Sequence, residues 1–492
     1  MPMVEAASAG FVKPCGTLFC LDGKTFNVAG TNNHYLGWGT QSEVDHVLND
    51  AKAMNLNVVR TILHSVRGSL DGNQVNQGTM PLKWNWGSTA DSSNMGMKGV
   101  YILYWDTSSK TMAWNDSTVD GLGRWDYVIW KAKQLGIKLD IALLDFWQWA
   151  GGVQQINANF KGGNYDISNA SDRYSFFFTD SRTKQFYKSW VNHVPNRTNT
   201  LTGVKYRDDP TIFAWDLMNE PEMSSTSTGQ SWISEMSAYV KTIDSNHMVA
   251  SGNEGFADAH AGSSPQLEMT IRTIDFATWH TYPTYHHITT NDVVNLITAN
   301  CQIATTGKKP VLVQEFGYPS DHSDQAGVYQ SWVDTIQKNS NCAGWMFWRL
   351  EGIEQNGSYP PDNGEHLGVY NNNSITSQVF KNAAFKLISR NGSSPTTTPR
   401  PAPNPAATPR PANTPLPTST PVSTARETFV MGINFNGPAV TIQGHNWLSY
   451  SSAKGQGLGV LGAITDTKLL PPQPACGCTD DFNAEYAHLC SQ

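Results

Sequence analysis

Short apolar segments alternate with amphipathic stretches along roughly the first 390 residues of this chain, and this alternation limits its possible folds. The apolar segments do not alternate with polar residues, so they predict strands that are buried on both faces of a parallel sheet. The stretches between them have helical periodicity, and several end on Asn or Gly just before the next strand. We count about eight strand–helix units, the number and order of a (β/α)₈ barrel. A doubly wound open sheet is the alternative. The expected strands are 26–32, 56–63, 137–147, 211–220, 247–252, 274–280, 310–317 and 343–350, and the expected helices are 42–55, 122–136, 231–244, 293–307, 328–339 and 377–390.

The composition changes sharply once, where Pro, Thr and Ala replace nearly every large apolar residue. Such a segment cannot form a core, and it is typical of a semi-rigid spacer. We therefore expect a barrel domain at 11–392, a Pro/Thr/Ala-rich linker at 393–425 and a short C-terminal part at 426–492. That last part contains strand-like alternation and an Asn-Gly turn signal, which predict a small β-rich module or a truncated accessory module.

Charge and hydropathy exclude several classes of function. A net charge of −7 without basic clusters argues against a nucleic-acid partner, and no stretch is long and apolar enough for a membrane span. The chain contains 17 Trp and 17 Tyr, whose flat rings with a polar edge are suited to stacking on sugars. The opening "MPMVEAASAG" has neither the basic start nor the apolar run of a signal peptide, so we expect a mature chain that was cut from a longer precursor. We also expect the protein to be secreted and monomeric.

The seven cysteines form two groups. In the first, Cys15 and Cys20 flank a short turn and are placed to close a hairpin, while Cys301 ends an expected helix and Cys342 opens the last expected strand, which suggests a second bridge. The second group, at the end of the chain, is Cys476, Cys478 and Cys490. Asn-x-Ser/Thr triplets at Asn115, Asn169, Asn196, Asn356 and Asn391 also favour an extracellular location.

Two carboxylates stand at the ends of separate expected strands. Glu220 closes "IFAWDLMNE" before Pro221, and Glu315 follows "PVLVQ". Since Pro221 cannot donate to a strand ladder, we expect its strand to stop at Glu220. In a barrel the carboxyl ends of the strands converge on one mouth, so the two side chains should meet there. Paired carboxylates are what glycoside hydrolysis requires, one to protonate the leaving oxygen and one to attack or to activate water.

Other strand ends are unusually polar or aromatic. They carry Arg60, Trp147, Asn219, His280, Tyr282 and Trp348. Cationic and hydrogen-bonding groups can position the carboxylates and adjust their pKa values, and Trp348 can lie beneath a sugar ring. We expect no cofactor and no metal, because the adjacent His286 and His287 point apart in an extended segment and no acid partner accompanies them.

These strand ends resemble glycoside hydrolase family 5 of clan A, over nearly all of residues 20–390. "NEP" and "QEFG" carry most of the resemblance, together with "RTILH", "WHTYP" and "FWRL" in the same order. The resemblance implies a retaining (β/α)₈ glycosidase in which Glu220 is the acid/base and Glu315 the nucleophile. It also implies that Arg60, Asn219, His280, Tyr282 and Trp348 surround them.

Within that family the chain is most similar to fungal and plant-type endo-β-1,4-mannanases. "IFAWDLMNEP", "VKTIDSNHMV", "DFATWHTYP" and "GWMFW" carry this similarity, and so does "ALLDFWQWAGG" with Trp147. The chain departs from that pattern at Asp145-Phe146, where mannanases have an Asn pair, and at Tyr285, where a Trp is usual. An endo-β-1,4-glucanase or another family 5 β-glycosidase is therefore the alternative, followed by a non-catalytic polysaccharide binder.

The mechanism implied by the family sets one expectation for the geometry of the two glutamates and one for their electrostatics. The carboxyls of Glu220 and Glu315 should lie about 5 to 5.5 Å apart. Partial burial and the charge of Glu315 should raise the pKa of Glu220, while Arg60 and the Tyr282 hydroxyl should hold Glu315 in its ionised form.

A long insert after the second strand should shape one wall of the cleft. Its Trp84, Trp86 and Trp105 are open to two interpretations, sugar stacking or packing of the insert itself. Asp145 is likewise open, as a sugar ligand or as the partner of an arginine.

Overall fold

The computed structural model describes residues 10–63, 65–67, 100–148, 151–255, 262–362 and 364–391, together with three short strands between 432 and 449. The chain divides into two compact units, Met1–Thr398 and Pro399–Gln492. Within the described residues, no helix has both the length and the apolar character needed to cross a membrane. Trp84 and Trp86, which the sequence left open, lie outside the described residues.

The first unit is a (β/α)₈ barrel, as the sequence predicts. Its eight strands all run parallel and follow one another around the sheet in chain order. The strands are β4 (Val28–Asn32), β5 (Val58–Ile62), β8 (Lys138–Ala142), β9 (Ile212–Asp216), β10 (Met248–Ala250), β11 (Ala277–Thr281), β12 (Val311–Phe316) and β13 (Cys342–Phe347). Backbone bonds from Asp275 N to Val249 O (2.8 Å) and from His280 N to Glu254 O (2.7 Å) join the segments of β10 and β11, which brings the two ends of the sheet together.

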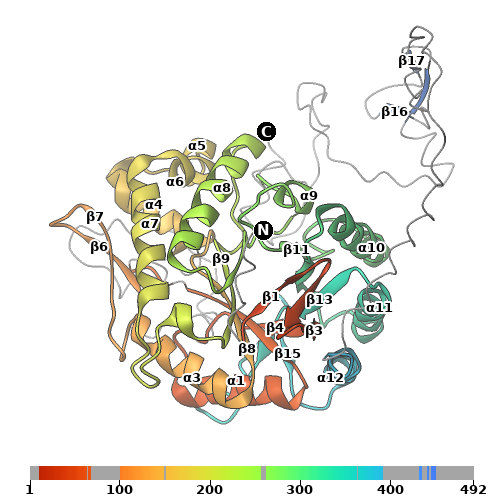
Figure 1. Ribbon diagram of the computed structural model, residues 1–492, viewed down its shortest axis with the longest axis horizontal. Helices are drawn as coiled ribbons and strands as arrows, with labels where there is room; N and C mark the ends of the chain where they lie inside the picture. The colour runs from red at the N-terminus through yellow and green to blue at the C-terminus, as the bar shows by residue number, and fades with distance from the viewer. Residues whose placement is uncertain are drawn as a thin grey trace, which may run out of the picture. The chain divides into compact units, whose positions relative to one another are not determined.

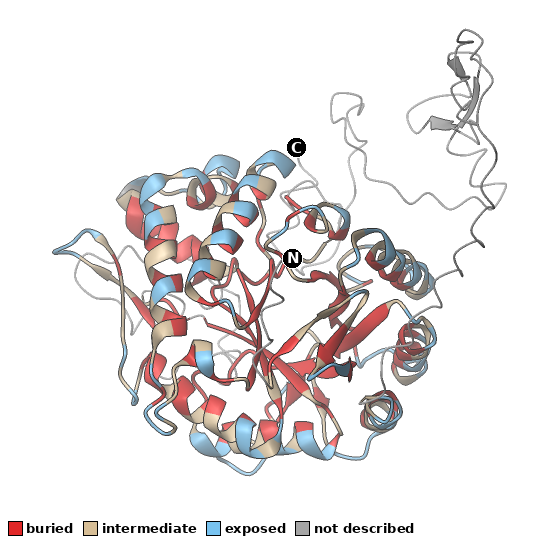
Figure 2. Cartoon of the chain, viewed as in Figure 1, coloured by how far each residue is buried: buried red, intermediate tan, exposed pale blue. Residues whose placement is uncertain are grey.

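Helices surround the strands, with their buried sides toward the sheet and their exposed sides outward (Figure 1, Figure 2). They are α1 (Gln41–Ala53), α3 (Trp125–Leu135), α4 (Gly152–Lys161), α5 (Ala170–Tyr174), α6 (Phe176–Thr179), α7 (Ser181–Asn196), α8 (Thr226–Ile243), α9 (Pro265–Glu268), α10 (Thr290–Gly307), α11 (Gln325–Lys338) and α12 (Ile375–Ile388), with 3₁₀ turns at Leu122–Arg124, Gly162–Asn164 and Tyr206–Asp208.

Helix ends follow the expected chemistry. Thr40 and Glu43 form a capping box at the start of α1, so two backbone N–H groups that lack helical partners are satisfied. Asn55 after α1 and Gly136 after α3 adopt the left-handed conformation that ends a helix before a strand.

Smaller sheets complete the described structure. β1 (Val12–Cys15), β2 (Leu18–Leu21) and β3 (Lys24–Phe26) form an antiparallel sheet, and β6 (Leu103–Asp106) pairs with β7 (Thr111–Trp114). β14 (Leu350–Glu351) pairs with β15 (Val369–Tyr370). In the second unit, β18 (His445–Ser449) lies between β16 (Gly432–Asn434) and β17 (Val440–Ile442). The domain boundaries expected at 392 and 425 stay predictions.

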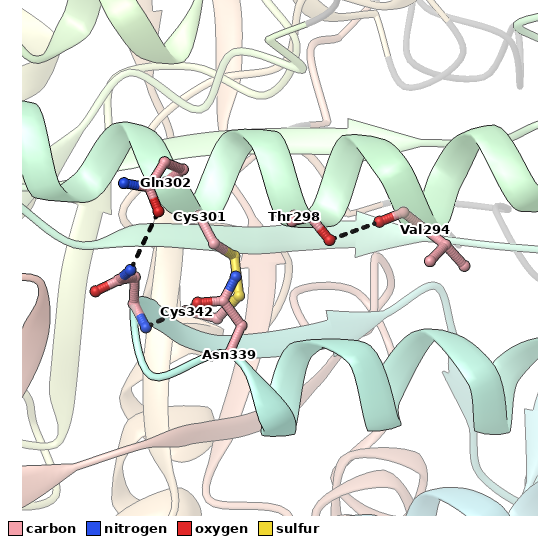
Figure 3. Close-up of a disulfide and its surroundings, with 7 residues drawn as sticks. Val294, Thr298, Cys301, Gln302, Asn339 and Cys342 are labelled. Carbon is pink, nitrogen blue, oxygen red and sulfur yellow. Dashed lines mark hydrogen bonds between the residues drawn. A yellow bond between two sulfur atoms is a disulfide. The ribbon is translucent and has the colours of Figure 1, made fainter. Parts of the chain in front are cut away.

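Two disulfides join the cysteines of the first unit in the pairs that the sequence suggested. Cys15–Cys20 links β1 to β2. Cys301–Cys342 links α10 to the first residue of β13 (Figure 3). Cys342 stands at the amino end of its strand, so this bridge lies away from the carboxyl ends where polar side chains gather.

Some elements differ from the sequence-based expectation. The strand expected to reach Glu220 ends at Asp216, and only an isolated bridge between Asp145 and Asn219 continues the pairing. The strand expected over 137–147 likewise ends at Ala142. The helices α4 to α7 and the hairpin β6–β7 were not expected. The ring of Trp105, in β6, packs edge-on against the ring of Phe160, with the ring centres 5.1 Å apart. This contact supports packing rather than sugar stacking as the role of Trp105.

Candidate active site

The interior of the barrel changes from apolar to polar along several of its strands. Because alternate residues of a strand face the same side, Val58 and Arg60 both point inward from β5. Inward residues near the amino ends, among them Val58, Ala214 and Leu312, form one buried apolar cluster. The next inward residues on the same three strands are Arg60, Asp216 and Gln314, and these three are hydrogen-bonded to one another in a chain. The polar layer therefore lies above an apolar one, toward the carboxyl ends of the strands.

Arg60 is the centre of the polar layer and is fully buried. Its Nε donates to Asp216 Oδ2 (2.8 Å), and one terminal nitrogen donates to Glu315 Oε1 (2.5 Å) and to Asn32 Oδ1 (3.2 Å). The other terminal nitrogen donates to Asn219 Oδ1 (2.9 Å). A planar guanidinium thereby fixes the positions of four groups from β4, β12, and β9 with the segment that follows it.

Glu315 lies within β12 and is buried. Its Oε1 accepts from Arg60, and its Oε2 accepts from the Tyr282 hydroxyl. Burial raises the pKa of the Glu315 carboxyl, and the negative charge of Glu220 raises it further, whereas His280, Arg60 and Tyr282 act in the opposite direction. Both donors observed here stabilise the ionised carboxylate, as expected from the sequence.

Glu220 adopts a left-handed backbone conformation with φ of 44°, which is uncommon for a residue with a side chain. Its N–H donates to Gly252 O at 2.8 Å, and the N–H of Asn219 donates to Leu144 O at 2.8 Å, so neighbouring loops hold this turn. Gly252 itself has φ of 75°, and a Cβ there would lie 2.0 Å from Met218 O. This turn ends the strand before Glu220 and directs the carboxyl into the mouth of the barrel.

The two oxygens of Glu220 have different neighbours. Trp147 Nε1 donates to Oε2 at 2.7 Å, and His280 Nδ1 lies 2.6 Å from Oε1. Burial raises the pKa of the Glu220 carboxyl to about 7, with a further contribution from Asp145. The leading neighbouring negative charge is thus that of Asp145 rather than that of Glu315, which the sequence suggested. At neutral pH this carboxyl is poised to hold or release a proton.

The side chains of Asn219 and Asp145 are hydrogen-bonded to each other beside the two glutamates. Asn219 Oδ1 accepts from Arg60, and its Nδ2 donates to Asp145 Oδ1 at 3.0 Å. Asp145 therefore supports an amide, a role that neither interpretation from the sequence included.

Glu220, His280 and Glu315 each place one ligand-type atom within 4.8 Å of the others. These three are the candidate metal ligands among the described residues. Their oxygens already accept from Arg60, Tyr282 and Trp147, so a cation bound there would compete with the guanidinium for Glu315. The arrangement suits proton transfer and nucleophilic attack on a substrate better than it suits a metal.

Trp348 follows β13 at the edge of this group. Its N–H donates to the carbonyl of Phe316, the residue after Glu315, at 2.9 Å. Its partly exposed ring stacks near His34, with ring centres 5.9 Å apart. Each of seven predicted site residues is thus hydrogen-bonded to at least one other, and Trp348 lies beside them through its backbone.

Four buried residues of the site were missed in the sequence analysis. Asn32, Asp140, Asp216 and Gln314 are inward polar residues within strands that otherwise read as continuous apolar runs. A polar residue at an inward position of a fully buried strand would have been the signal, since such a group needs a partner inside the barrel.

A (β/α)₈ barrel with one buried and one partly buried carboxylate of unequal surroundings, at the carboxyl ends of its strands, has the fold and site of a glycoside hydrolase. A family model described as "GH family 5 beta-mannosidase-like" matches residues 88–368. The chain belongs to glycoside hydrolase family 5.

Several relatives and solved structures resemble this chain. Mannan endo-1,4-beta-mannosidase 1 of Oryza sativa is 31% identical, over 69% of this chain and 78% of the relative. A probable mannan endo-1,4-beta-mannosidase A of Aspergillus flavus is 30% identical, over 74% of this chain and 85% of the relative. The crystal structure of the endo-1,4-beta-mannanase from Rhizomucor miehei matches with a TM-score of 0.64 and 31% identity, over 77% of this chain and 99% of that chain.

Proposed function

We propose that this chain is a retaining endo-acting hydrolase of β-1,4-mannosidic linkages in mannan, glucomannan or galactomannan, with Glu220 as the acid/base and Glu315 as the nucleophile. The observation that carries this proposal is the pair of carboxylates, which are close together but have different hydrogen-bond partners. A carboxylate oxygen of Glu220 lies within 4.8 Å of one of Glu315. This close approach of their oxygens supports the retaining mechanism, whose carboxyl groups lie about 5 to 5.5 Å apart, over an inverting one, whose carboxyl groups stand roughly 6.5 to 9.5 Å apart to admit a water.

The roles of the two glutamates follow from their surroundings. Glu315 receives a cationic and a phenolic donor, which stabilise the charge that a nucleophile must keep. Glu220 has a raised pKa of about 7, so it carries the proton that a departing sugar oxygen needs. After the glycosyl-enzyme forms, the ionised Glu220 takes a proton from the water that attacks it.

The remaining residues orient the substrate. Asn219 Nδ2 carries two hydrogens, of which Asp145 accepts one. We assign the other to the 2-hydroxyl of the sugar, where contacts strengthen in the transition state. Trp348 supplies an apolar ring at the edge of the site for the sugar face.

The choice of mannan is supported by the relatives, several of which are named as mannan endo-1,4-beta-mannosidases. Two disulfides within the barrel unit support secretion, because such bridges persist in oxidising compartments. Recovery of the mature chain from the culture medium of its native host would test that part.

Release of reducing sugars from mannan, glucomannan and carboxymethyl cellulose tests the activity. We expect hydrolysis of the two mannose-containing polymers and little or none of the cellulose derivative. Faster hydrolysis of carboxymethyl cellulose would make this an endoglucanase, and folded protein inactive on all three would favour a polysaccharide binder.

A further inference from the structure

Gln314 lies in β12 directly before Glu315 and is fully buried in the polar layer. Its Nε2 donates to Asp140 Oδ2 (2.9 Å) and to Asp216 Oδ2 (2.8 Å). Its Oε1 lies 3.2 Å from His280 Nε2. Gln314 thus connects a pair of buried aspartates to the histidine that faces Glu220.

The chemistry of its neighbours fixes which way the Gln314 amide points. Asp216 Oδ2 also accepts from Arg60 Nε, so it is an ion-paired acceptor with no proton to donate. An amide oxygen placed 2.8 Å from that atom would set two acceptors against each other in a buried site. The NH₂ group must therefore face the aspartates, which leaves the carbonyl oxygen facing His280.

This orientation determines the tautomer of His280. A carbonyl oxygen can only accept, so His280 Nε2 must carry a hydrogen. Burial lowers the pKa of the His280 imidazole to about 4, so near neutral pH the ring is neutral and has a single N–H. Its Nδ1 then presents a lone pair to Glu220 Oε1, 2.6 Å away.

A lone pair at that distance requires a hydrogen on the other atom. Glu220 Oε2 accepts from Trp147 Nε1, so the proton of the neutral carboxyl belongs on Oε1, where it points at His280. We propose that Gln314 is a positioning residue that selects the Nε2–H tautomer of His280 and thereby keeps Glu220 protonated at rest. This inference rests on the proposed role of Glu220 as acid/base.

The same arrangement assists both halves of the reaction. Glu220 gives its Oε1 proton to the glycosidic oxygen as the bond to the sugar breaks. The resulting carboxylate then faces the Nδ1 lone pair of His280, an unfavourable pairing that increases its basicity. It recovers a proton from the attacking water in the second half, and the resting state returns.

Other charged groups also act on this pair and are part of its environment. Glu315 Oε2 lies 3.6 Å from His280 Nδ1, and Arg60 is bonded to the same carboxylate. Asp145 and His286 act on Glu220, and Asp216 acts on His280. All of them remain when Gln314 is replaced, but the substitution also removes the two hydrogen bonds that Gln314 donates to Asp140 and Asp216. The tautomer of His280, rather than the pH dependence alone, therefore reports the contact between Gln314 and His280.

The test is Gln314→Met, which preserves the length of the side chain and removes the acceptor. Without that acceptor His280 can carry its hydrogen on Nδ1 and donate it to ionised Glu220, which lowers the pKa of Glu220. We expect ¹⁵N NMR of histidine-labelled full-length protein to show the Nε2–H tautomer of His280 in the wild type and the Nδ1–H tautomer in the variant. The resonance is identified by its loss in His280→Asn. The alkaline limb of kcat/KM should move about one pH unit lower.

Gln337→Met is the matched control, since Gln337 is a buried glutamine of α11 whose Nε2 donates to Ala383 O at 2.8 Å. It should leave both the tautomer and the pH limb unchanged. If Gln314→Met does not fold, Gln314→Asn withdraws the carbonyl from His280 with a smaller change. An Nδ1–H tautomer in the wild type, or an unchanged tautomer in a folded Gln314 variant, would overturn the proposal.

The NMR readout needs no substrate, so it separates this inference from the proposed function. If the wild type hydrolyses mannan but its His280 carries the hydrogen on Nδ1, the proposed function stands and only the role assigned to Gln314 is refuted. If the protein hydrolyses no glycan but shows the expected tautomers, the acid/base role of Glu220, on which the inference rests, is refuted.

Discussion

The lower and upper halves of the barrel interior hold opposite kinds of side chain, and the small sheet β1–β3 contributes Phe19 and Phe26 to the lower half. The lower half contains the rings of Phe19, Phe26, Phe213 and Phe276, whose centres lie 5.1 to 6.2 Å apart in the four pairs in contact. The upper half contains Arg60 and the acids and amides around it. Apolar packing stabilises without directing chemistry, whereas a buried polar network is costly unless every member is paired. Stability from the lower half therefore offsets the cost of holding two carboxylates in fixed positions in the upper half.

The largest effect on activity is expected in the upper half. Glu220→Ala should slow mannan hydrolysis by roughly 10²–10⁴-fold but spare formation of the glycosyl-enzyme from a substrate with a good leaving group, whose departure needs no proton. Glu315→Ala should slow both by at least about 10⁴-fold. Steady-state and pre-steady-state kinetics measure these effects.

Added azide provides the control for those roles. Azide should rescue Glu220→Ala with a product of retained configuration, because it replaces the water that attacks the glycosyl-enzyme formed on Glu315. It should rescue Glu315→Ala with an inverted product, because it attacks the substrate directly in place of the missing carboxylate. The reverse pattern of configurations would exchange the assigned roles.

The lower half should respond to substitution with stability alone. Phe213→Ala removes a ring that contacts Phe19, Phe26 and Phe276, and we expect the free energy of unfolding to fall by about 3–5 kcal/mol. Denaturant unfolding measures this loss. At a temperature where the variant remains folded, kcat/KM should stay within about two-fold of the wild type, and a large loss of activity there would join the two halves into one functional unit.

A third prediction concerns the pH dependence of stability, to which Glu220 in the upper half contributes and the apolar lower half does not. The pKa of Glu220 is about 7 in the fold against 4.5 for the free side chain, so between these values the unfolded chain has released a proton that the native state retains. Stability therefore falls as pH rises through this window, by about 3 kcal/mol from this group alone.

Glu220→Gln removes that titration, so its stability relative to the wild type should rise between pH 4.5 and 7. Unfolding curves at several pH values measure the difference. Parallel pH profiles for the two proteins would show that Glu220 has an ordinary pKa. Phe213→Leu is the matched control, since it should shift the whole curve without changing its shape.

The smallest effect is expected from the C-terminal part, which belongs to neither half. A chain that ends at Ser393 should retain kcat/KM on soluble mannan within about two-fold, because we expect the Pro/Thr-rich segment to act as a spacer between the barrel and the C-terminal part. Asn391 must be kept, since its side chain bonds the backbone of Asn27 next to β4. Loss of activity by this folded truncated chain would show that the tail contributes to turnover.

Much of the fold and the central pair of the site could be predicted from the sequence. The run of apolar segments indicated the barrel, because buried parallel strands leave a local pattern. Glu220 and Glu315 were predictable because each follows such a segment and carries a charge that burial must explain. The end of β9 was predicted wrongly, since the left-handed turn at Glu220 is imposed by backbone contacts to Gly252 and Leu144 from other segments.

The order of the strands, the class of chemistry and most of the residues that we propose to perform it were accessible from the sequence, because strand periodicity and charge are local properties. The partners of those residues were not accessible before the barrel was seen. Arg60 lies 156 positions from Asp216 and 255 from Glu315, and nothing local in the chain records that they touch. The orientation of Gln314 depends on aspartates from two other strands. Hydrogen-bond direction within a buried network is a property of the whole set of neighbours, so it exists only once the barrel has closed.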